Sequence, residues 1–154
     1  MSAQHVLTQC LDKGLTIAFA ESMTGGGACY EMIKHAGASR VVLGGIIAYQ
    51  EELKANLLDI DFDTIRRNGV VSLEVARLMA KNISKKTNAS IGVGVTGNAG
   101  PTLQEGVSGL VCFVSIYMSD SYHDLELVFE DLTREEAIQL TIDAIYQKLD
   151  EILD

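Results

Sequence analysis

The sequence predicts a three-layer α/β/α sandwich with a mixed central sheet, and two observations support this prediction. Apolar, β-branched runs of strand length alternate with stretches whose apolar residues recur at helical spacing. Two of the strand-like runs also end in hydroxyl residues and glycines, at 22–27 and 96–101. Strand, turn and helix in succession are typical of α/β proteins, which bind ligands at the carboxyl ends of their strands.

The first half of the chain supplies two of the predicted strands. The predicted elements are a helix near 6–11, a strand at 15–20, a helix at 28–36, a strand at 41–49 and a short helix at 51–58. The turn at Lys13-Gly14 separates the first helix from the first strand, and Gly37 ends the second helix.

The second half supplies three more strands. The predicted elements are a helix at 73–86, strands at 91–96, 109–118 and 125–129, and a closing helix from 134 to about 152. Ser72 is a good N-cap for the first of these helices, and Thr133 with Glu136 forms a capping box before the last.

Composition limits the classes of function. The 154 residues are expected to form one domain, 1–154, with a substantial core. The net charge of −9 argues against nonspecific binding to nucleic acid or acidic membranes, but it permits a small phosphorylated ligand. With no membrane-length apolar run and three cysteines outside any CxxC pattern, we expect a cytoplasmic protein without a metal site or cofactor.

Ser22 is the first candidate for chemistry. It follows a strand-like run and precedes Gly25 and Gly26, whose amides would stabilise a developing oxyanion if Ser22 were a nucleophile. The alternative is that Ser22 or Thr24 only caps the following helix. The local sequence leaves both interpretations open.

Lys54 and Tyr49 are the next candidates, because a lysine or tyrosine can activate a serine when no histidine is near. A lysine serves as a base only when burial or a nearby cation lowers its pKa. The residues alone favour a solvated lysine beside Glu51 and Glu52, and an interface tyrosine.

Three further residues complete the candidate site. Thr96 and Gly97 begin a second hydroxyl- and glycine-bearing loop, so a pocket shared with the Ser22 loop is plausible. Glu21 would orient a base, bind a ribose hydroxyl or act as a cap, and its neighbours do not decide among these roles. Arg134 would reach a phosphate, or would be a solvated side chain in the first turn of the last helix.

These stretches together resemble the CinA carboxy-terminal-domain family, the nicotinamide-mononucleotide amidohydrolases. The matching segments are 20–26, 37–39, 44–49, Lys54 with 57–58, 69–72, 74–76, 79–80, 96–101, Gly109 and 134–135. The resemblance implies hydrolysis of the carboxamide of nicotinamide mononucleotide to nicotinate mononucleotide and ammonia, without a metal or cofactor. It assigns Ser22 as the nucleophile and Tyr49 with Lys54 as its activating partners. The implied substrate-binding residues are Glu21, Thr24, Gly25, Gly26, Thr96, Gly97 and Arg134.

The chain departs from the family pattern at several positions. Met23 stands where the family usually has cysteine, and Asn98 stands where it usually has an aliphatic residue. The loop 102–108 lacks a lysine-proline pair, and Ile138 replaces a second arginine. An alternative is therefore a degenerate member that binds a nucleotide or other small ligand without turnover. A homo-oligomer is expected, and a third hypothesis is a structural or regulatory protein that self-associates through strand 41–48.

Overall fold

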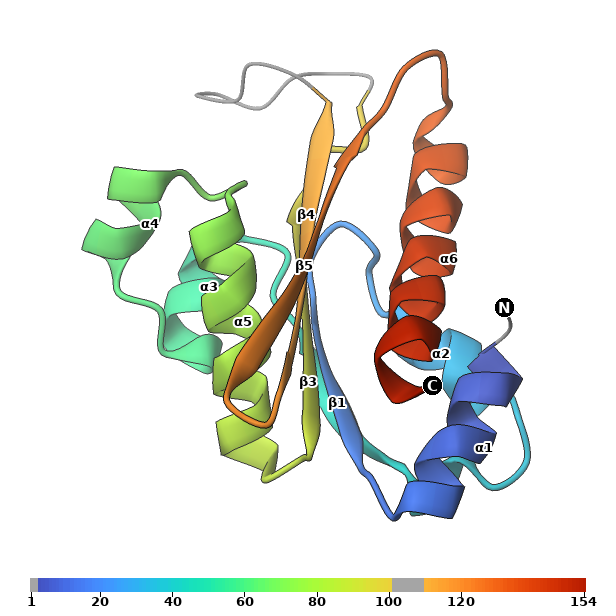
Figure 1. Cartoon of the computed structure of the whole chain (residues 1–154). Helices are drawn as coiled ribbons and strands as arrows, with labels where there is room; N and C mark the ends of the chain where they lie inside the picture. The colour runs from blue at the N-terminus through green and yellow to red at the C-terminus, as the bar shows by residue number, and fades with distance from the viewer. Residues whose placement is uncertain (1–2, 101–109) are drawn as a thin grey trace.

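The computed structural model describes residues 3–100 and 110–154, and it has the predicted α/β architecture. The elements are α1 (Ala3–Lys13), β1 (Ile17–Glu21), α2 (Gly27–Ile33), the 3₁₀ turn η1 (Ala38–Arg40), β2 (Val42–Ile47), α3 (Glu51–Leu58), α4 (Phe62–Asn68), α5 (Leu73–Thr87), β3 (Ile91–Gly97), β4 (Val111–Met118), β5 (Ser121–Val128) and α6 (Arg134–Leu153). Helices α1, α2 and α6 cover one face of the sheet and α3, α4 and α5 the other (Figure 1).

The sheet is mixed, as the sequence predicts. Its strand order is β2-β1-β3-β4-β5; β1 pairs in parallel with β2 and β3, whereas β3–β4 and β4–β5 are antiparallel. β1 therefore lies between two parallel neighbours, and every one of its residues is buried. Alternation along β1 sends Ile17 and Phe19 into the core beneath α6 and α1, and Ala18 and Ala20 into the core beneath α5.

Close packing of α5 on the sheet depends on glycines in β3. An ideal Cβ on Gly94 would lie 2.3 Å from the Ala76 carbonyl oxygen and 2.5 Å from the Ala80 amide nitrogen. Gly92 is equally tight, with 2.1 Å to the Ala80 carbonyl oxygen. The helix backbone thus rests directly on the strand, where no side chain fits.

Most of the predicted elements are confirmed. The predicted helix at 51–58 has the bounds of α3, and the Ser72 cap and the Thr133 capping box are both present. The predicted helix at 28–36 is too long, because α2 ends at Ile33. α4 was not predicted, and β5 begins at Ser121 rather than at residue 125. The predicted start of a strand at Gly109 lies outside the described residues.

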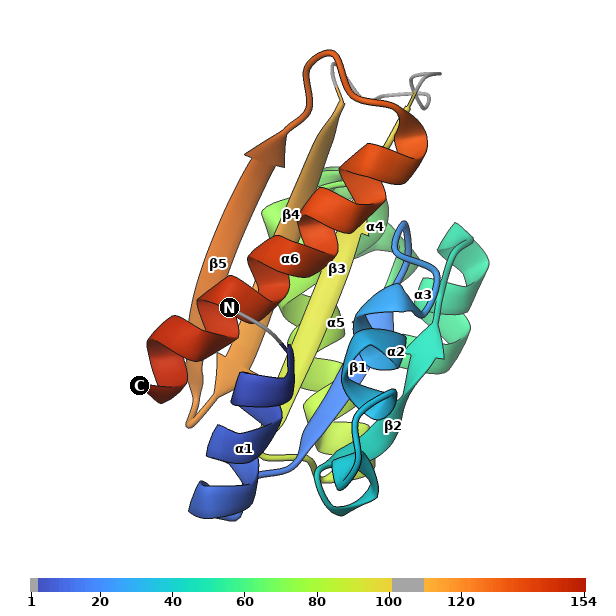
Figure 2. The same ribbon diagram turned by 90° about the vertical axis from the view of Figure 1, so that its right-hand side faces the viewer.

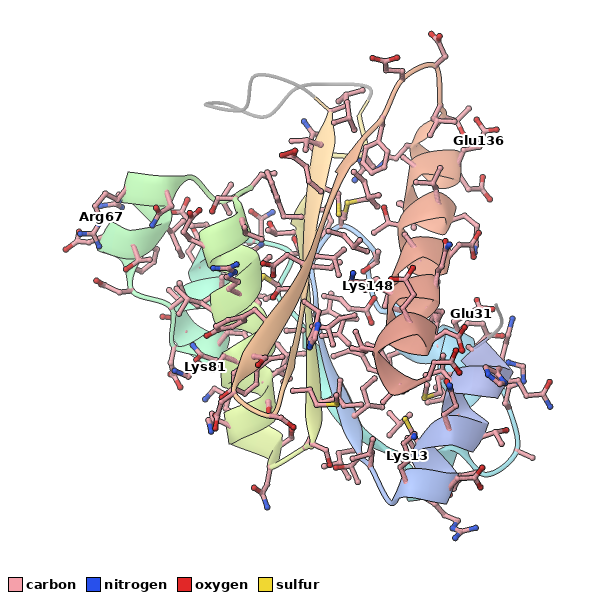
Figure 3. The ribbon with its side chains drawn as sticks, in the orientation of Figure 1. Lys13, Glu31, Arg67, Lys81, Glu136 and Lys148 are labelled. Carbon is pink, nitrogen blue, oxygen red and sulfur yellow. The ribbon has the colours of Figure 1, made fainter. Side chains whose placement is uncertain are left out.

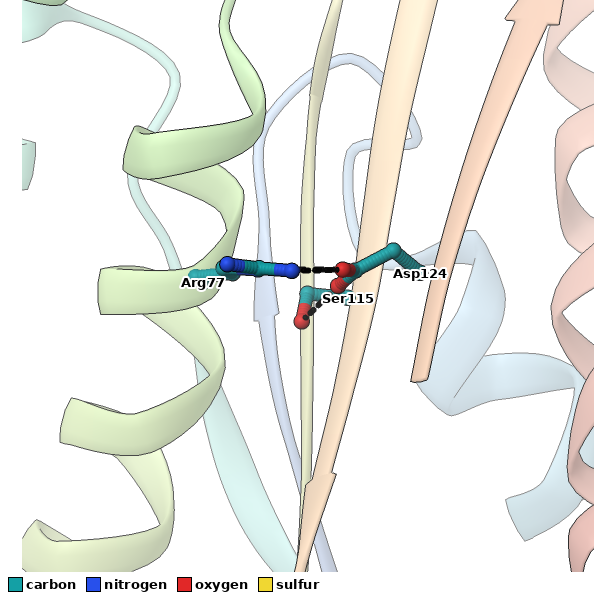
Figure 4. A network of polar contacts seen from close by, with 3 residues as sticks. All are labelled: Arg77, Ser115 and Asp124. Carbon is teal, nitrogen blue, oxygen red and sulfur yellow. Dashed lines mark hydrogen bonds and ion pairs between the residues drawn. The ribbon is translucent and has the colours of Figure 1, made fainter. Parts of the chain in front are cut away.

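A polar network fastens β4 and β5 to α5 (Figure 4). Arg77 of α5 donates to Asp124 of β5 from Nε at 3.0 Å and from Nη2 at 2.5 Å, and the buried Ser115 hydroxyl of β4 donates to the same carboxylate at 2.8 Å. The Arg77 guanidinium also lies over the Tyr122 ring, 5.1 Å from its centroid.

Charged side chains elsewhere, such as Arg67, Lys81 and Glu136, point away from the core (Figure 3). No helix in the described part of the chain has both the length and the apolar character needed to span a membrane.

Candidate active site

The strand register brings the two predicted loops to the same place. Ala20 of β1 lies opposite Gly94 of β3, and Glu21 lies opposite Ile47 of β2. Carried forward along the chain, these registers set Ser22 level with Thr96 on one side and Ala48 on the other. The Ala48 amide donates to the Glu21 carbonyl at 2.7 Å, which extends the pairing beyond β2. Ser22 thus stands at the carboxyl end of the central parallel strands.

Lys54 is buried against Ser22. Its side chain is 1% exposed, and its Nζ lies 3.0 Å from Ser22 Oγ, 2.8 Å from the Ala48 carbonyl oxygen and 3.4 Å from that of Tyr49. Burial lowers the pKa of Lys54 from 10.5 to about 8, although nearby Glu51 acts in the opposite direction. The interpretation of Lys54 as a solvated surface lysine is therefore wrong. It failed because the local sequence does not show that this face of α3 packs on the sheet.

The contacts of the Lys54 amine suit a neutral base. A neutral amine has two N–H donors and one lone pair. If the Ala48 and Tyr49 carbonyls accept the two donors, the lone pair points at Ser22 Oγ and can accept its proton. These two backbone carbonyls hold the Lys54 amine beside Ser22. Sequence patterns could not reveal these contacts, because a backbone carbonyl has no residue signature.

The Tyr49 side chain has a different partner. It is 51% exposed, and its hydroxyl oxygen accepts a hydrogen bond from Arg134 Nη2 at 2.7 Å. Within the described residues, Tyr49 forms a hydrogen bond with Lys54 only through its carbonyl oxygen. Arg134 also donates from Nη1 to the Gly100 carbonyl at 2.7 Å. It therefore links the start of α6, the second loop and Tyr49, and we call these residues the rim of the site.

Glu21 caps α2. It is buried; its Oε1 accepts from the Thr24 hydroxyl at 2.6 Å and from the Ala28 amide at 2.9 Å, and its Oε2 accepts from the Cys29 amide at 3.0 Å. Of the roles left open for Glu21, these contacts match capping. The N-cap residue of α2 is Gly26, which has no side chain to do this. Neither Ser22 nor Thr24 caps the helix, so their hydroxyl oxygens do not accept hydrogen bonds from the first amides of α2.

The amides of the first loop differ in availability. Gly25 N–H donates to the Ser22 carbonyl at 3.0 Å, so the turn itself occupies one amide that was expected to bind an oxyanion. The amides of Met23, Thr24 and Gly26 have no acceptor among residues 3–100 and 110–154. Donors of this kind next to a nucleophile can stabilise a developing oxyanion.

The second loop packs against the first. An ideal Cβ on Gly97 would lie 2.6 Å from Met23 Sδ, so glycine at this position allows the two loops to meet. Thr96 is buried and donates to the Val70 carbonyl at 2.8 Å. Asn98 is 3% exposed; its Oδ1 accepts from the Gly100 amide at 3.0 Å, but its Nδ2 has no partner in the part of the chain that is described. The altered loop at 102–108 lies outside the described residues.

The three cysteine thiols, all within the described residues, are poor nucleophiles. Burial raises the pKa of Cys10 to about 11 and that of Cys112 to about 12, and it also raises the pKa of Cys29. These thiols are therefore protonated at neutral pH. Across residues 3–100 and 110–154, no cluster of three or more histidine, cysteine, aspartate or glutamate side chains is arranged to hold a metal ion.

Comparison with known proteins identifies the family. The family model described as the CinA C-terminal domain matches residues 1–153. The chain belongs to this family.

Relatives with and without additional sequence share this domain. The "Protein MG115 homolog" of Mycoplasma pneumoniae is 35% identical over 153 residues, which are 99% of this chain and 98% of that protein. The "Putative competence-damage inducible protein" of Listeria innocua is 39% identical over 114 residues, 74% of this chain but 28% of that protein. The match thus spans about a quarter of the length of such larger relatives.

Solved structures of the CinA family have the same fold. The competence/damage inducible protein CihA from Agrobacterium tumefaciens is 26% identical, with a TM-score of 0.89 over 98% of this chain and 91% of that chain. A CinA superfamily protein from Escherichia coli is 18% identical, with a TM-score of 0.93 over 97% of this chain and 87% of its own. At that identity, the second likeness concerns the fold alone.

Proposed function

We propose that this CinA domain hydrolyses the carboxamide of nicotinamide mononucleotide to nicotinate mononucleotide and ammonia, with Ser22 as the nucleophile and Lys54 as its general base. The observation that carries the proposal is the 3.0 Å separation of Lys54 Nζ and Ser22 Oγ, in a place where burial lowers the pKa of the amine to about 8. A base whose pKa lies near neutrality can both take and return a proton. The resemblance to the amidohydrolases of the family supplies the substrate. The protein is proposed to work in the cytoplasm.

The chemistry follows in two steps. Ser22 Oγ bonds to the amide carbon while its proton moves to Lys54, and the carbonyl π electrons move to the oxygen, where the loop amides of Met23, Thr24 and Gly26 stabilise them. The tetrahedral intermediate collapses, the C–N bond breaks, and Lys54 returns the proton so that ammonia leaves. Water then attacks the acyl-enzyme with the same base, which releases the nicotinate product and restores Ser22.

The remaining candidate residues are proposed to position the nucleotide. The guanidinium of Arg134 donates hydrogen bonds from Nη1 to the Gly100 carbonyl and from Nη2 to the Tyr49 hydroxyl. Its remaining N–H groups can donate to a phosphate. Thr96 and Gly97 line the side of Ser22 opposite Ala48. Tyr49 is proposed to act with Lys54 in two ways. The Tyr49 carbonyl oxygen accepts a hydrogen bond from the Lys54 amine, and the Tyr49 hydroxyl oxygen accepts one from Arg134.

The direct test is ammonia release from nicotinamide mononucleotide by the purified chain. Wild type is expected to turn over, and Ser22→Ala and Lys54→Met are each expected to lose at least about 10²-fold in kcat. Ser39→Ala, an exposed serine on the 3₁₀ turn η1, is the matched control and should retain full activity. If wild type releases no more ammonia than Ser22→Ala, the proposed reaction is wrong.

The pH dependence of kcat tests the role of Lys54 separately. Only the neutral amine accepts the serine proton, so kcat should rise about tenfold per pH unit below about 8 and level off above it. The residual rate of Lys54→Met should lack this rise. A wild-type rate that falls between pH 6 and 8 would exclude Lys54 as the base.

A second candidate is a ligand-binding domain without turnover. Ile138, which packs against the core one turn after Arg134, removes a cation from this rim, and a charge-assisted hydrogen bond contributes about 1.5–3 kcal/mol. Calorimetry with nicotinamide mononucleotide separates the two functions. Binding without ammonia release would favour this candidate, whereas serine-dependent turnover would reject it.

A further inference from the structure

The negative charge of the chain is concentrated toward its carboxyl end. Residues 119–154 contain eleven acidic and two basic side chains, so their formal net charge is −9, which equals that of all 154 residues. Residues 1–118 are therefore neutral overall, with ten side chains of each sign. The acidic segment contains β5 and α6. Figure 2 shows β5 at the free edge of the sheet and α6 lying across the sheet beside it.

A groove of about 550 Å³ separates β5 from α6, and we call it the β5–α6 groove. Its apolar lining comes from both elements and from the connection between them: Leu127, Leu132, Leu140 and Ala144. Leu140 is 41% exposed, so part of this lining faces solvent. Glu136 and Asp143 also line the groove, and both are exposed. The groove is thus apolar with two carboxylates at its surface.

The groove-facing residues of α6 form one stripe. Glu136, Leu140 and Asp143 follow each other at spacings of four and three, which places them on one face of the helix. The stripe therefore presents a carboxylate, an apolar side chain and a second carboxylate over about 10 Å. β5, on the other side of the groove, pairs with β4 alone in the described structure, so the other edge of its backbone is free to accept another strand.

The two carboxylates of the groove have no cationic partner in the described part of the chain. The ion pairs within residues 3–100 and 110–154 use other carboxylates, and neither Glu136 nor Asp143 takes part in one. Glu136 accepts a hydrogen bond from the Thr133 amide and Asp143 accepts one from Gln139, but these donors are neutral. The negative charge of both groups therefore remains uncompensated.

This charge decides among the possible occupants of the groove. A segment of net charge −9 repels nucleic acid, acidic membranes and further copies of the chain. A cationic segment is attracted instead, and the exposed apolar lining favours one that also carries an apolar side chain.

We propose that the β5–α6 groove binds an extended cationic segment of a partner protein, in which two lysine or arginine residues flank an apolar residue at alternate positions. In an extended segment these three side chains point to the same side and span about 13 Å. The two long cationic side chains reach Glu136 and Asp143, and the apolar residue packs on Leu140. The backbone of the segment pairs with the free edge of β5. Ser22 and Lys54 lie outside the lining of the groove, so this inference does not depend on the proposed reaction.

NMR titration of the intact, isotope-labelled chain with short peptides tests the proposal. The probe is the end-blocked peptide Thr-Lys-Thr-Val-Thr-Lys-Thr, in which threonine favours an extended form. We expect it to bind in the submillimolar range, to shift the amide signals of β5 and α6, and to bind more weakly as salt is added. Two control peptides replace both lysines by glutamate or the valine by threonine. Each should bind at least about tenfold more weakly, because it lacks the complementary charge or the apolar contact.

Variants of the chain locate the binding site. Asp143→Lys should weaken binding of the lysine peptide at least about tenfold and strengthen binding of the glutamate peptide, and Leu140→Ser should weaken binding of the lysine peptide. Glu52→Lys is the matched control: it makes the same change in net charge at an exposed position of α3, on the opposite face of the sheet, and should bind like wild type. Circular dichroism must show that each variant is folded.

Four results would overturn the proposal. They are a lysine peptide that does not bind wild type, signal shifts that lie away from β5 and α6, a threonine-substituted peptide that binds as tightly as the probe, and a folded Asp143→Lys variant that binds the probe like wild type.

Discussion

Lys54 is buried, and its surroundings stabilise the charged amine less well than water does. Three oxygens accept from its amine, and Glu51 favours the charged form, yet burial outweighs these effects and lowers its pKa to about 8. Ionisable groups with strongly shifted pKa values are typical of functional sites. The cost of burying this amine should therefore appear in the stability of the protein.

We expect the stability that Lys54 costs to be recovered at high pH. The folded pKa of about 8 lies below the unfolded value near 10.5, so the unfolded chain binds more protons between these limits. The free energy of unfolding of wild type should rise relative to Lys54→Met by up to about 3 kcal/mol as the pH increases from 8 to 10.5. Urea unfolding of both proteins at pH 7, 9 and 10 measures this. A constant difference across that range would contradict it.

Glu21→Gln should destabilise the protein by about 1.5–3 kcal/mol, because an amide group cannot replace all three hydrogen bonds that the buried carboxylate accepts. Glu31→Gln on α2, the helix that Glu21 caps, is the control. Glu31 forms a partly exposed ion pair with Lys34, and its loss should cost much less than the loss of the buried Glu21 carboxylate, because solvent screens the pair. Chemical denaturation compares the two variants, and equal losses would show that Glu21 is not an essential cap.

The residue-scale predictions from sequence depended on position relative to strand and helix ends. Ser22 could be singled out because it follows a strand and precedes glycines. Capping by Glu21 could not, because Glu21 precedes the N-cap residue Gly26 by a full turn and belongs to β1. The burial of Lys54 depends on tertiary packing, which local sequence does not record.

At the scale of elements, the strength of the apolar pattern decided what could be predicted. α3, α5 and α6 have clear periodicity and caps, and their predicted bounds agree with the structure to within about two residues. α4 offers only Phe62 and Ile65 at helical spacing, and burial of Ile65 stabilises it. The start of β5 is polar because that part of the edge strand is only partly covered, so its pattern did not indicate a strand.

Gly94→Ala should be among the most destabilising small substitutions in the chain, because the new Cβ would meet the α5 backbone at Ala76 and Ala80. We expect a loss of about 3 kcal/mol or more, since backbone on both sides prevents relaxation. Gly14→Ala is the control: it has open space but a φ of +66°, so only backbone strain of about 1 kcal/mol applies. Thermal unfolding ranks the two, and the reverse order would contradict the close contact.

For the whole molecule, the network of Arg77, Ser115 and Asp124 links strands β4 and β5 to helix α5. Burial raises the pKa of Asp124, but the hydrogen bonds from Arg77 and Ser115 and the charge of Arg77 lower it by more, so the pKa lies below its ordinary value of 3.8. The stability from this pair is therefore present at neutral pH and is lost as the pH falls through the folded pKa.

Arg77→Gln should cost less than about 1 kcal/mol at pH 7, because the Arg77 side chain is 44% exposed and solvent screens the pair. Once Asp124 is protonated in both states, the difference from wild type should narrow. Thermal unfolding at pH 7 and at a pH well below 3.8 measures both differences. A difference that widens on acidification would show that the pair is not the source of the stability.

The assembly of the candidate site could be anticipated only in outline. The resemblance named both loops, but their meeting depends on β1 lying between β2 and β3, and on a glycine at 97 that leaves space for Met23. Strand order and register arise from contacts between distant parts of the chain. Sequence periodicity does not encode them, and a shift of one residue would turn Ser22 to the other face.

α6 couples two distant regions of the protein. Its first residue, Arg134, holds Tyr49 and Gly100 at the site rim, while Ile145, Leu149 and Leu153 near its other end pack in the core that includes α1. Twenty helical residues extend about 30 Å as a stiff rod. Truncation of the carboxyl terminus, or a bulky insertion beneath α1, would therefore tilt the Arg134 guanidinium at the remote end and loosen its hydrogen bonds to Tyr49 and Gly100.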